Sequence, residues 1–197
     1  TYAFKNLKAK TIAYSDTWKH DLKNAFYLSP SDLDALDTAF GKFLAQNTLD
    51  FISENSLQNK VELLASHGHT VFHQPQNKIT VQIGSGKELN ALTGIKVIND
   101  FRIIDVLLGG QGAPLVPFGD LHLFSTYQAC LNLGGFSNIS FDQNQKRIAF
   151  DISPCNLPIN QLCKKYFNLE FDRNGDLAES GKLIDALFIE LNTIPYY

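Results

Sequence analysis

The chain is organised around residues 100–117, which read DFRIIDVLLGGQGAPLVP. They follow residues 95–98, a short apolar and β-branched run that predicts a buried strand. A strand that leads into charged residues and a glycine cluster brings charge and bare backbone to the rim of a sheet, where ligands of open α/β sheets bind. The glycines within residues 109–112 permit positive φ and a close approach of backbone to ligand. The same composition also fits a structural surface turn, so this stretch alone leaves both readings open.

The composition is that of a globular protein. Of the 197 residues, 44% are hydrophobic and 19% are charged, and this length holds one domain of about 150 residues plus part of another. The formal net charge of −3, without a cluster of Lys and Arg, argues against nucleic-acid binding. No apolar run approaches the ~20 residues of a membrane-spanning helix, and no signal-peptide pattern opens the chain. We therefore expect neither a nucleic-acid nor a membrane partner.

The cysteine and methionine content indicates the cellular compartment of the chain and its relation to a longer protein. The three cysteines, Cys130, Cys155 and Cys163, are odd in number and lack CxxC spacing, which argues against a disulfide framework or a zinc site. A reducing cytoplasm is the expected location. Methionine is absent even from position 1, so we expect the sequence to belong to a longer protein.

Apolar spacing and capping residues predict the elements before residue 100. Ser29 and Pro30 begin a helix over residues 30–54, because Ser is a preferred N-cap and Pro fits the first turn. A shorter helix is expected over residues 16–27. The other expected elements are strands over residues 4–14 and 61–65, a hairpin of 71–73 with 79–83, a helix over 87–92 and the strand over 95–98.

The second half of the chain has a different pattern, a glycine-containing antiparallel meander followed by helices. We place the boundary between the two parts between residues 124 and 128. The alternation of strands and helices predicts an α/β fold with a mixed sheet. The expected elements are strands over residues 128–133, 137–141 and 147–151 and helices over 157–167 and 179–192.

Polar side chains gather at several expected strand ends. His67 and His69 lie on one strand face, as metal ligands would, but no nearby Cys, Glu or Asp completes a set, and His69 fits a turn cap equally well. Arg102 fits two roles: an ion pair with Asp100 that holds a corner, or a donor presented to an anion or a sugar. We expect Asp105 to be a helix or turn residue.

Asp151 follows the apolar residues 148–150 at the end of an expected strand. A partly buried carboxylate there suits a general base, and it equally suits a cap of the next helix. Gly134 and Gly135 can offer backbone N–H groups to phosphate or form only a tight turn. The chain has no GxxxxGK[ST] motif and no GxGxxG motif after its first strand, which excludes a P-loop NTPase and argues against a Rossmann dehydrogenase.

Together these segments resemble the anhydro-N-acetylmuramic acid kinase family, most closely its Bacteroidetes-like branch. The resemblance covers nearly the whole chain, and residues 109–117 carry its most specific motif. The matching segments keep the family's order and spacing. They are residues 65–75, 82–84, 93–95, 100–105, 109–117 and 131–140, which read ASHGHTVFHQP, QIG, TGI, DFRIID, GGQGAPLVP and LNLGGFSNIS.

The resemblance implies the actin-like fold of the hexokinase, Hsp70 and actin group, in which two RNase-H-like lobes hold ATP and sugar in a cleft. Residues 1–127 would form a first lobe without its N-terminal phosphate hairpin, and residues 128–197 the truncated beginning of a second lobe. The implied reaction uses ATP, Mg²⁺ and water to open the 1,6-anhydro ring of anhydro-N-acetylmuramic acid and to phosphorylate O6. The product is N-acetylmuramic acid 6-phosphate, for cell-wall recycling. The family also suggests a homodimer.

The resemblance also assigns roles to individual residues. The family's Asp-Thr-Gly-Pro-Gly-Asn segment carries the carboxylate that deprotonates the attacking water. It corresponds here to Asp-Ile-Ser-Pro-Cys-Asn, so Asp151 inherits the catalytic role. The change of Thr and Gly to Ile152 and Ser153 affects the loop and not the carboxylate. The residues implied around the sugar are His67, Gly68, Arg102, Gln111 and Asn156, and those implied around the ATP phosphates are Gly134, Gly135 and Asn138; no metal ligand is assigned.

The chain departs from the family in what it lacks. The family's opening phosphate hairpin, GTMSGTSLDG, is not found, nor are the adenine-side glycines and a further acidic sugar contact of the second lobe. We therefore expect residues 1–197 alone to have no kinase activity. The alternative is a non-catalytic actin-like module, a sugar-binding or chaperone-type relative.

Overall fold

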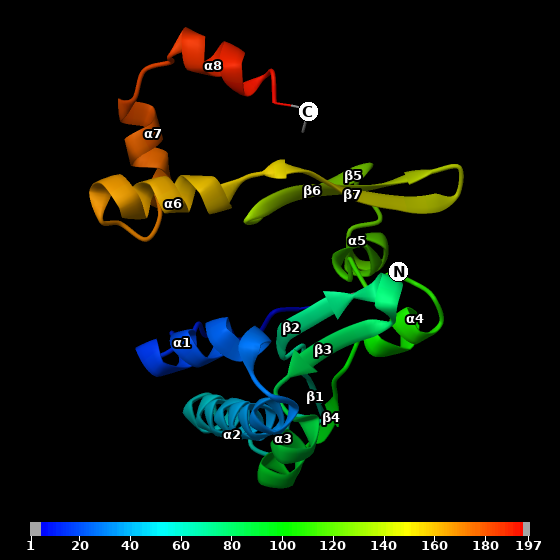
Figure 1. The fold of residues 1–197 in the computed structure, drawn as a ribbon. Helices are drawn as coiled ribbons and strands as arrows, with labels where there is room; N and C mark the ends of the chain where they lie inside the picture. The colour runs from blue at the N-terminus through cyan, green and yellow to red at the C-terminus, as the bar shows by residue number, and fades with distance from the viewer. Residues whose placement is uncertain (1–4, 195–197) are drawn as a thin grey trace. The chain divides into compact units, whose positions relative to one another are not determined.

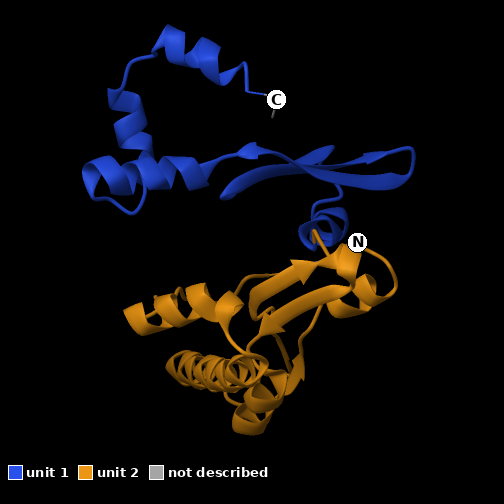
Figure 2. Cartoon of the chain, viewed as in Figure 1, with its two compact units in different colours: residues 1–4, 115–197 blue, residues 5–114 orange. Residues whose placement is uncertain are grey.

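The computed structural model describes residues 5–194, which form two compact units. One unit contains residues 5–114 and the other residues 115–194 (Figure 2). Both combine helices with strands, which confirms the predicted α/β class (Figure 1). The predicted mixed sheet is wrong for the described residues, because their parallel and antiparallel strand pairs belong to separate sheets. Within the described residues no helix is both long enough and apolar enough to cross a membrane.

Two helices joined by a 3₁₀ turn open the first unit. They are α1 (Asp16–Asn24), η1 (Ala25–Tyr27) and α2 (Pro30–Glu54). Both helices begin at a serine N-cap: Ser15 Oγ accepts the N–H of Trp18, and Ser29 Oγ plays the same part at the start of α2. Pro30 fits the first turn of α2 because it has no N–H to satisfy. The two predicted helices are confirmed.

The strand predicted over residues 4–14 is wrong for the part that the structure describes. Residues 5–14 form no strand, and Phe4 lies outside the described residues. A strand needs a neighbour that pairs with its N–H and C=O groups, and no described strand pairs with this segment. Tyr14 instead packs against Phe40 and Phe43 of α2, with ring centroids 6.1 and 5.9 Å apart.

Two small sheets and two helices complete the first unit (Figure 1). Their elements are β1 (Leu63–Ala65), β2 (His69–Gln74), η2 (Pro75–Asn77), β3 (Ile79–Ile83), α3 (Gly86–Thr93), β4 (Lys96–Ile98) and α4 (Ile103–Leu107). Strand β1 is parallel to β4, whereas β2 and β3 form an antiparallel hairpin with a bulge between Thr70 and Phe72. The predicted hairpin, strands and helix are confirmed, and Asp105 lies in α4, the helical alternative for this residue.

The core of the first unit is built on α1, η1, α2 and the hairpin. Leu22, Ala25, Phe40 and Ile83 are buried there, with exposed fractions of 6% or less. The Phe40 ring also contacts that of Trp18, with centroids 5.3 Å apart. The partly buried residues around this cluster are Trp18, Leu33, Leu36, Phe43, Leu44, Val71 and Val81. The core thus fixes the end of β3 against α2.

The second unit is a three-stranded antiparallel sheet with helices before and after it (Figure 1). Its elements are α5 (Val116–Leu123), β5 (Ala129–Leu133), β6 (Phe136–Gln143), β7 (Lys146–Pro154), α6 (Asn156–Phe167), η3 (Arg173–Gly175), α7 (Asp176–Ser180) and α8 (Asp185–Leu191). The strand order is β5-β6-β7, which confirms the predicted meander. The predicted division into lobes at residue 127 stays a prediction.

The single helix predicted over residues 179–192 is wrong. The chain forms α7 and α8 instead, and Gly181 between them has an extended backbone, with φ of −78° and ψ of 175°. Glycine is a poor helix former and ends α7 at Ser180. The apolar spacing across this region remains, but it is divided between two short helices.

Candidate functional site

The stretch after β4 folds around Asp105 of α4. The backbone N–H of Gly112 donates to Asp105 Oδ2 over 2.6 Å, and the N–H of Gly110 donates to the Asp105 carbonyl over 2.8 Å. Gly112 has a φ of +63°, and a Cβ atom there would lie 2.6 Å from Cγ2 of Val106. Glycine is therefore required at position 112. Sequence reasoning missed this role of Asp105, because a carboxylate that binds a backbone N–H seven residues ahead has no distinctive spacing.

Arg102 is held against this loop by its guanidinium group. Nη1 donates to the carbonyl of Gly112 over 2.8 Å, while Nη2 and Nε lie 2.9 and 3.3 Å from Nε2 of His67. The ion pair with Asp100, one of the two roles left open by the sequence, is not formed. The Asp100 carboxylate accepts a hydrogen bond from Asn99 Nδ2 over 2.7 Å instead. Among the described residues, the side-chain and backbone partners of the Arg102 guanidinium are thus an imidazole and a carbonyl group.

His67 lies in the connection between β1 and β2, beside Gly68. Nδ1 of His67 lies 3.0 Å from the carbonyl oxygen of Gly68. Gly68 has a φ of +68°, and a side chain there would collide with the carbonyl oxygen of Ile83. The structure therefore brings together three residues that the resemblance places around the sugar, His67, Gly68 and Arg102.

A pocket of about 290 Å³ adjoins His67 and Gly68. Its walls come from the end of β1, from α2 and from Tyr14, with Phe40 and Leu44 as apolar lining. Gln111, the fourth residue expected at the sugar, is exposed in the loop that precedes Gly112. The first unit thus has the Arg102 and His67 side chains close to a pocket that is partly lined by apolar side chains.

Gly134 and Gly135 form the turn between β5 and β6. Their carbonyl groups accept backbone N–H groups from the start of α6: that of Asn156 over 3.1 Å, and those of Cys155 and Leu157 over 2.8 and 3.1 Å. Within residues 5–194 neither glycine donates its own N–H to another protein group. The turn therefore carries two backbone donors without protein acceptors, a property that phosphate-binding turns share.

Asp151 lies within β7, opposite Asn138 of β6 in the antiparallel register. The expected partial burial of Asp151 is wrong, because the residue is exposed in the described unit. The second unit also fixes Asn156, whose Nδ2 donates to the Leu133 carbonyl over 2.9 Å. Backbone pairing thus places Asp151 opposite Asn138. Hydrogen bonds also join Asn156 to the turn at Gly134 and to Leu133.

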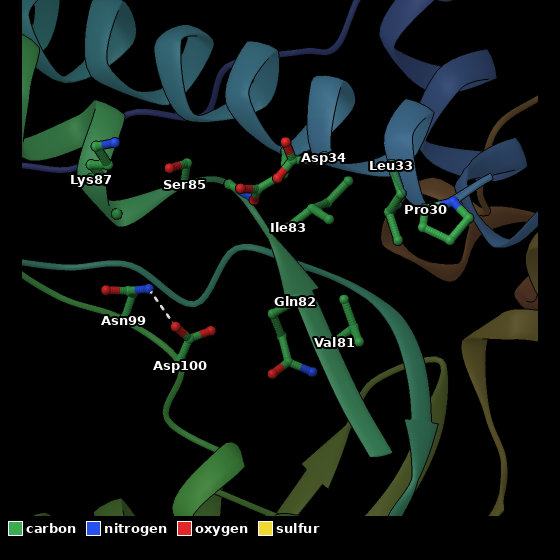
Figure 3. Close-up of a pocket in the computed structure, with 13 residues that line it drawn as sticks. Pro30, Leu33, Asp34, Val81, Gln82, Ile83, Ser85, Lys87, Asn99 and Asp100 are labelled. Atoms are coloured by element: carbon green, nitrogen blue, oxygen red, sulfur yellow. Dashed lines mark hydrogen bonds between the residues drawn. The ribbon is translucent and has the colours of Figure 1, made fainter. Parts of the chain in front are cut away.

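A second pocket of the first unit, of about 480 Å³, was not predicted from the sequence (Figure 3). It is lined by the start of α2, by the turn from β3 to α3, and by Asn99 and Asp100. Asp37 of α2 closes the turn, since its Oδ1 accepts the N–H of Gly84 over 2.7 Å. Burial raises the pKa of the Asp37 carboxyl; the hydrogen bond from Gly84 opposes this shift, and the charge of Asp34 adds to it.

No group of three or more His, Cys, Asp or Glu side chains in the described part of the chain could hold a metal ion. Nε2 of His67 lies against the Arg102 guanidinium, 2.9 Å from Nη2.

Comparison with known proteins gives one consistent family. A family model described as anhydro-N-acetylmuramic acid kinase matches residues 4–197. The protein of that name from Hydrogenovibrio crunogenus (strain DSM 25203 / XCL-2) is 34% identical over 200 residues, covering 97% of this chain and 54% of its own. The one from Bacillus cereus (strain AH820) is 32% identical over 202 residues, covering 94% and 53%. The chain spans about half the length of the curated relatives it matches.

Proposed function

The chain belongs to the anhydro-N-acetylmuramic acid kinase family, and from this premise we propose that the whole protein transfers a phosphoryl group from ATP to anhydro-N-acetylmuramic acid. Water adds to C1 of the sugar, the bond between C1 and O6 breaks, and O6 takes the γ-phosphoryl group. The product is N-acetylmuramic acid 6-phosphate. The family match along the chain carries this proposal, and the geometry within each unit supports it.

The sugar is bound by donors of the first unit. Arg102 supports this role because its guanidinium is fixed by His67 and by the Gly112 carbonyl before any ligand arrives. Preorganised donors lose little side-chain entropy on binding. The resemblance places Gly68, Gln111 and Asn156 around the sugar as well.

Asp151 is the general base. Its carboxylate takes the proton of the water that attacks C1, a step that requires hydrogen-bond reach to that water. An exposed position, as Asp151 has within its unit, leaves the carboxylate open to water. The geometry of β7 supports this role, because the strand pairing with β6 holds the backbone of Asp151 in place.

The ATP phosphates are bound by the turn of the second unit. The free N–H groups of Gly134 and Gly135 fit an anionic ligand, and the Asn138 amide adds a further donor. Mg²⁺ would neutralise charge on the phosphates, which ordinarily supply several of its ligands in kinases. The family also supports an actin-like fold for the whole protein.

The proposed location is the cytoplasm. The free cysteines Cys130, Cys155 and Cys163 favour such a reducing compartment.

The role of Asp151 is tested by Asp151→Asn in the complete gene product. We expect turnover to fall about 10²- to 10⁴-fold, the usual contribution of a positioned base. Sugar affinity, measured by isothermal titration, should change little, because the amide keeps the shape of the side chain. Product formation is followed by mass spectrometry of the sugar phosphate.

The control for this test is Asp142→Asn on the same pair of strands. Asp142 is exposed and pairs with Arg147 over 3.0 Å, so its loss should leave turnover within the error of the assay. Equal activity of Asp151→Asn and the wild type would reject the proposed base. It would also favour a non-catalytic sugar-binding module.

A further inference from the structure

We infer that His67 is a positioning residue: the unprotonated Nε2 of its Nδ1–H tautomer holds the Arg102 guanidinium in place for a ligand. The inference rests on the proposed function only for the identity of that ligand. The contacts themselves belong to the first unit and are independent of any reaction.

The tautomer follows from the chemistry of the two partners. A guanidinium group only donates hydrogen bonds, so the His67 nitrogen 2.9 Å from Nη2 and 3.3 Å from Nε must accept. An imidazole that accepts at Nε2 carries its proton at Nδ1. Nδ1 lies 3.0 Å from the Gly68 carbonyl, which is an acceptor. Both ring nitrogens of His67 therefore have the partner that this one tautomer requires.

The Gly112 carbonyl completes the hold on Arg102 from another side. It accepts from Nη1 over 2.8 Å, and the Gly112 N–H is itself fixed by the Asp105 carboxylate over 2.6 Å. His67 and Asp105 thus act on Arg102 from two segments of the chain that are far apart in sequence. All three guanidinium nitrogens have a protein partner.

The arrangement leaves donors for a ligand. A guanidinium has five N–H groups; one on Nε and one on each Nη are engaged with His67 and Gly112. One N–H on each Nη remains. Within residues 5–194 no carboxylate forms an ion pair with Arg102, so its charge is available to acceptor oxygens of a ligand. A carboxylate in place of His67 would cancel that charge, whereas a neutral imidazole orients the group and preserves it.

Nitrogen NMR of the ¹⁵N-labelled 197-residue chain tests the inference without any ligand. We expect His67 to show a protonated Nδ1 and an unprotonated Nε2, and the Arg102 Nε–H to exchange slowly with water. His67→Ala should accelerate that exchange, and His67→Gln should restore protection, since the amide carbonyl can also accept. His73→Ala is the control, because His73 contacts Thr80 in the hairpin and should leave Arg102 unchanged.

Two results would overturn the inference: a protonated Nε2 on His67, or Arg102 Nε–H exchange that is the same in His67→Ala and the wild type. The wild-type tautomer decides the matter even where a variant does not fold. In the complete gene product, His67→Ala should weaken binding of anhydro-N-acetylmuramic acid roughly tenfold to hundredfold, and His67→Gln should recover most of it. Absence of sugar binding by the wild type would reject the proposed function and leave the spectroscopic result to decide on His67.

Discussion

The candidate residues of the first unit, residues 5–114, lie beside a packed aromatic core. Those of the second unit, residues 115–194, lie on or next to a three-stranded sheet with much exposed apolar surface. Phe40 and Ile83 of the first unit are 1% and 2% exposed, while Leu131, Leu133 and Phe188 of the second are 57%, 60% and 57% exposed. The candidate side chains of the two units also differ in how firmly they are held. Arg102 is fixed at three nitrogens, whereas Asp151 is exposed within its unit.

The two units hold functional groups by different means. In the first, packing and tertiary hydrogen bonds fix side chains that lie far apart in sequence, such as Arg102 and His67. In the second, strand pairing fixes the backbone of Asp151, whose side chain is exposed. Substitutions in the first unit should therefore act through packing and strain, and those in the second should act locally.

The largest expected difference between the units is in core packing. Phe40→Ala removes a buried ring that contacts Tyr14, Trp18 and Phe43. We expect it to lower the free energy of unfolding of the first unit by about 3–5 kcal/mol, through lost burial and the cavity left behind. Urea denaturation followed by Trp18 fluorescence measures the change.

The matched substitution in the second unit is Phe188→Ala. Phe188 is 57% exposed in α8, so its truncation should change stability by no more than about 0.5 kcal/mol. Similar losses from the two variants would mean that the apolar side chains of the second unit are packed as firmly as the first-unit core, and the comparison would fail.

The next difference is in backbone strain. Gly68→Ala places a Cβ at a φ of +68° and against the Ile83 carbonyl oxygen. We expect a cost of about 1–3 kcal/mol, the usual penalty for a non-glycine residue held in a disfavoured region. The measurement is thermal unfolding of the chain. Because Gly68 also meets Nδ1 of His67, the Arg102 contact should weaken in parallel.

Gly119→Ala in α5 is the counterpart in the second unit. A Cβ at Gly119 meets nothing within 4 Å, and the residue is helical, so alanine should stabilise by about 0.5–1 kcal/mol. The opposite signs of the two glycine variants are the expected outcome. Tolerance of alanine at Gly68 would show that the turn is free to move away from β3.

Local signals predicted much of the fold. Ser29, Pro30 and the apolar spacing after them specify α2, because caps and periodicity act within a few residues of the positions they determine. The segment of residues 5–14 shows the limit: its alternation suits a strand, but a strand forms only with a partner. Gly181 shows a second limit of local signals. This one residue interrupts the apolar pattern that predicted a single helix.

The family resemblance named candidate residues but could not give the contacts between them. Family motifs named His67 and Arg102, yet their hydrogen bond joins residues 35 positions apart and leaves no mark on local spacing. Asp37 and Gly84 are 47 positions apart, and neither has a motif around it. The sequence predicted Asp105 only as a helix or turn residue and not as the acceptor of the Gly112 N–H. The roles of Asp151, Gly134 and Gly135 in a reaction stay predictions.

The last expected difference is electrostatic and concerns Asp37, a partly buried residue that lines the pocket shown in Figure 3. Burial raises its pKa above that in the unfolded chain, so the folded state binds its proton more tightly. The stability gained in this way is fully present below the unfolded pKa and is lost as pH rises through the folded pKa. Asp37→Asn keeps an oxygen for the Gly84 N–H but cannot titrate.

Relative to the wild type, Asp37→Asn should therefore gain stability as pH rises through that window, with a difference below about 1 kcal/mol at neutral pH. Chemical denaturation at a series of pH values measures it. Asp34→Asn is the control: it removes a neighbouring charge that raises the Asp37 pKa, so it should reduce the slope without abolishing it. A parallel pH profile for Asp37→Asn and the wild type would show that the carboxyl is solvated in the folded chain. The packing that distinguishes the first unit would then not extend to the start of α2.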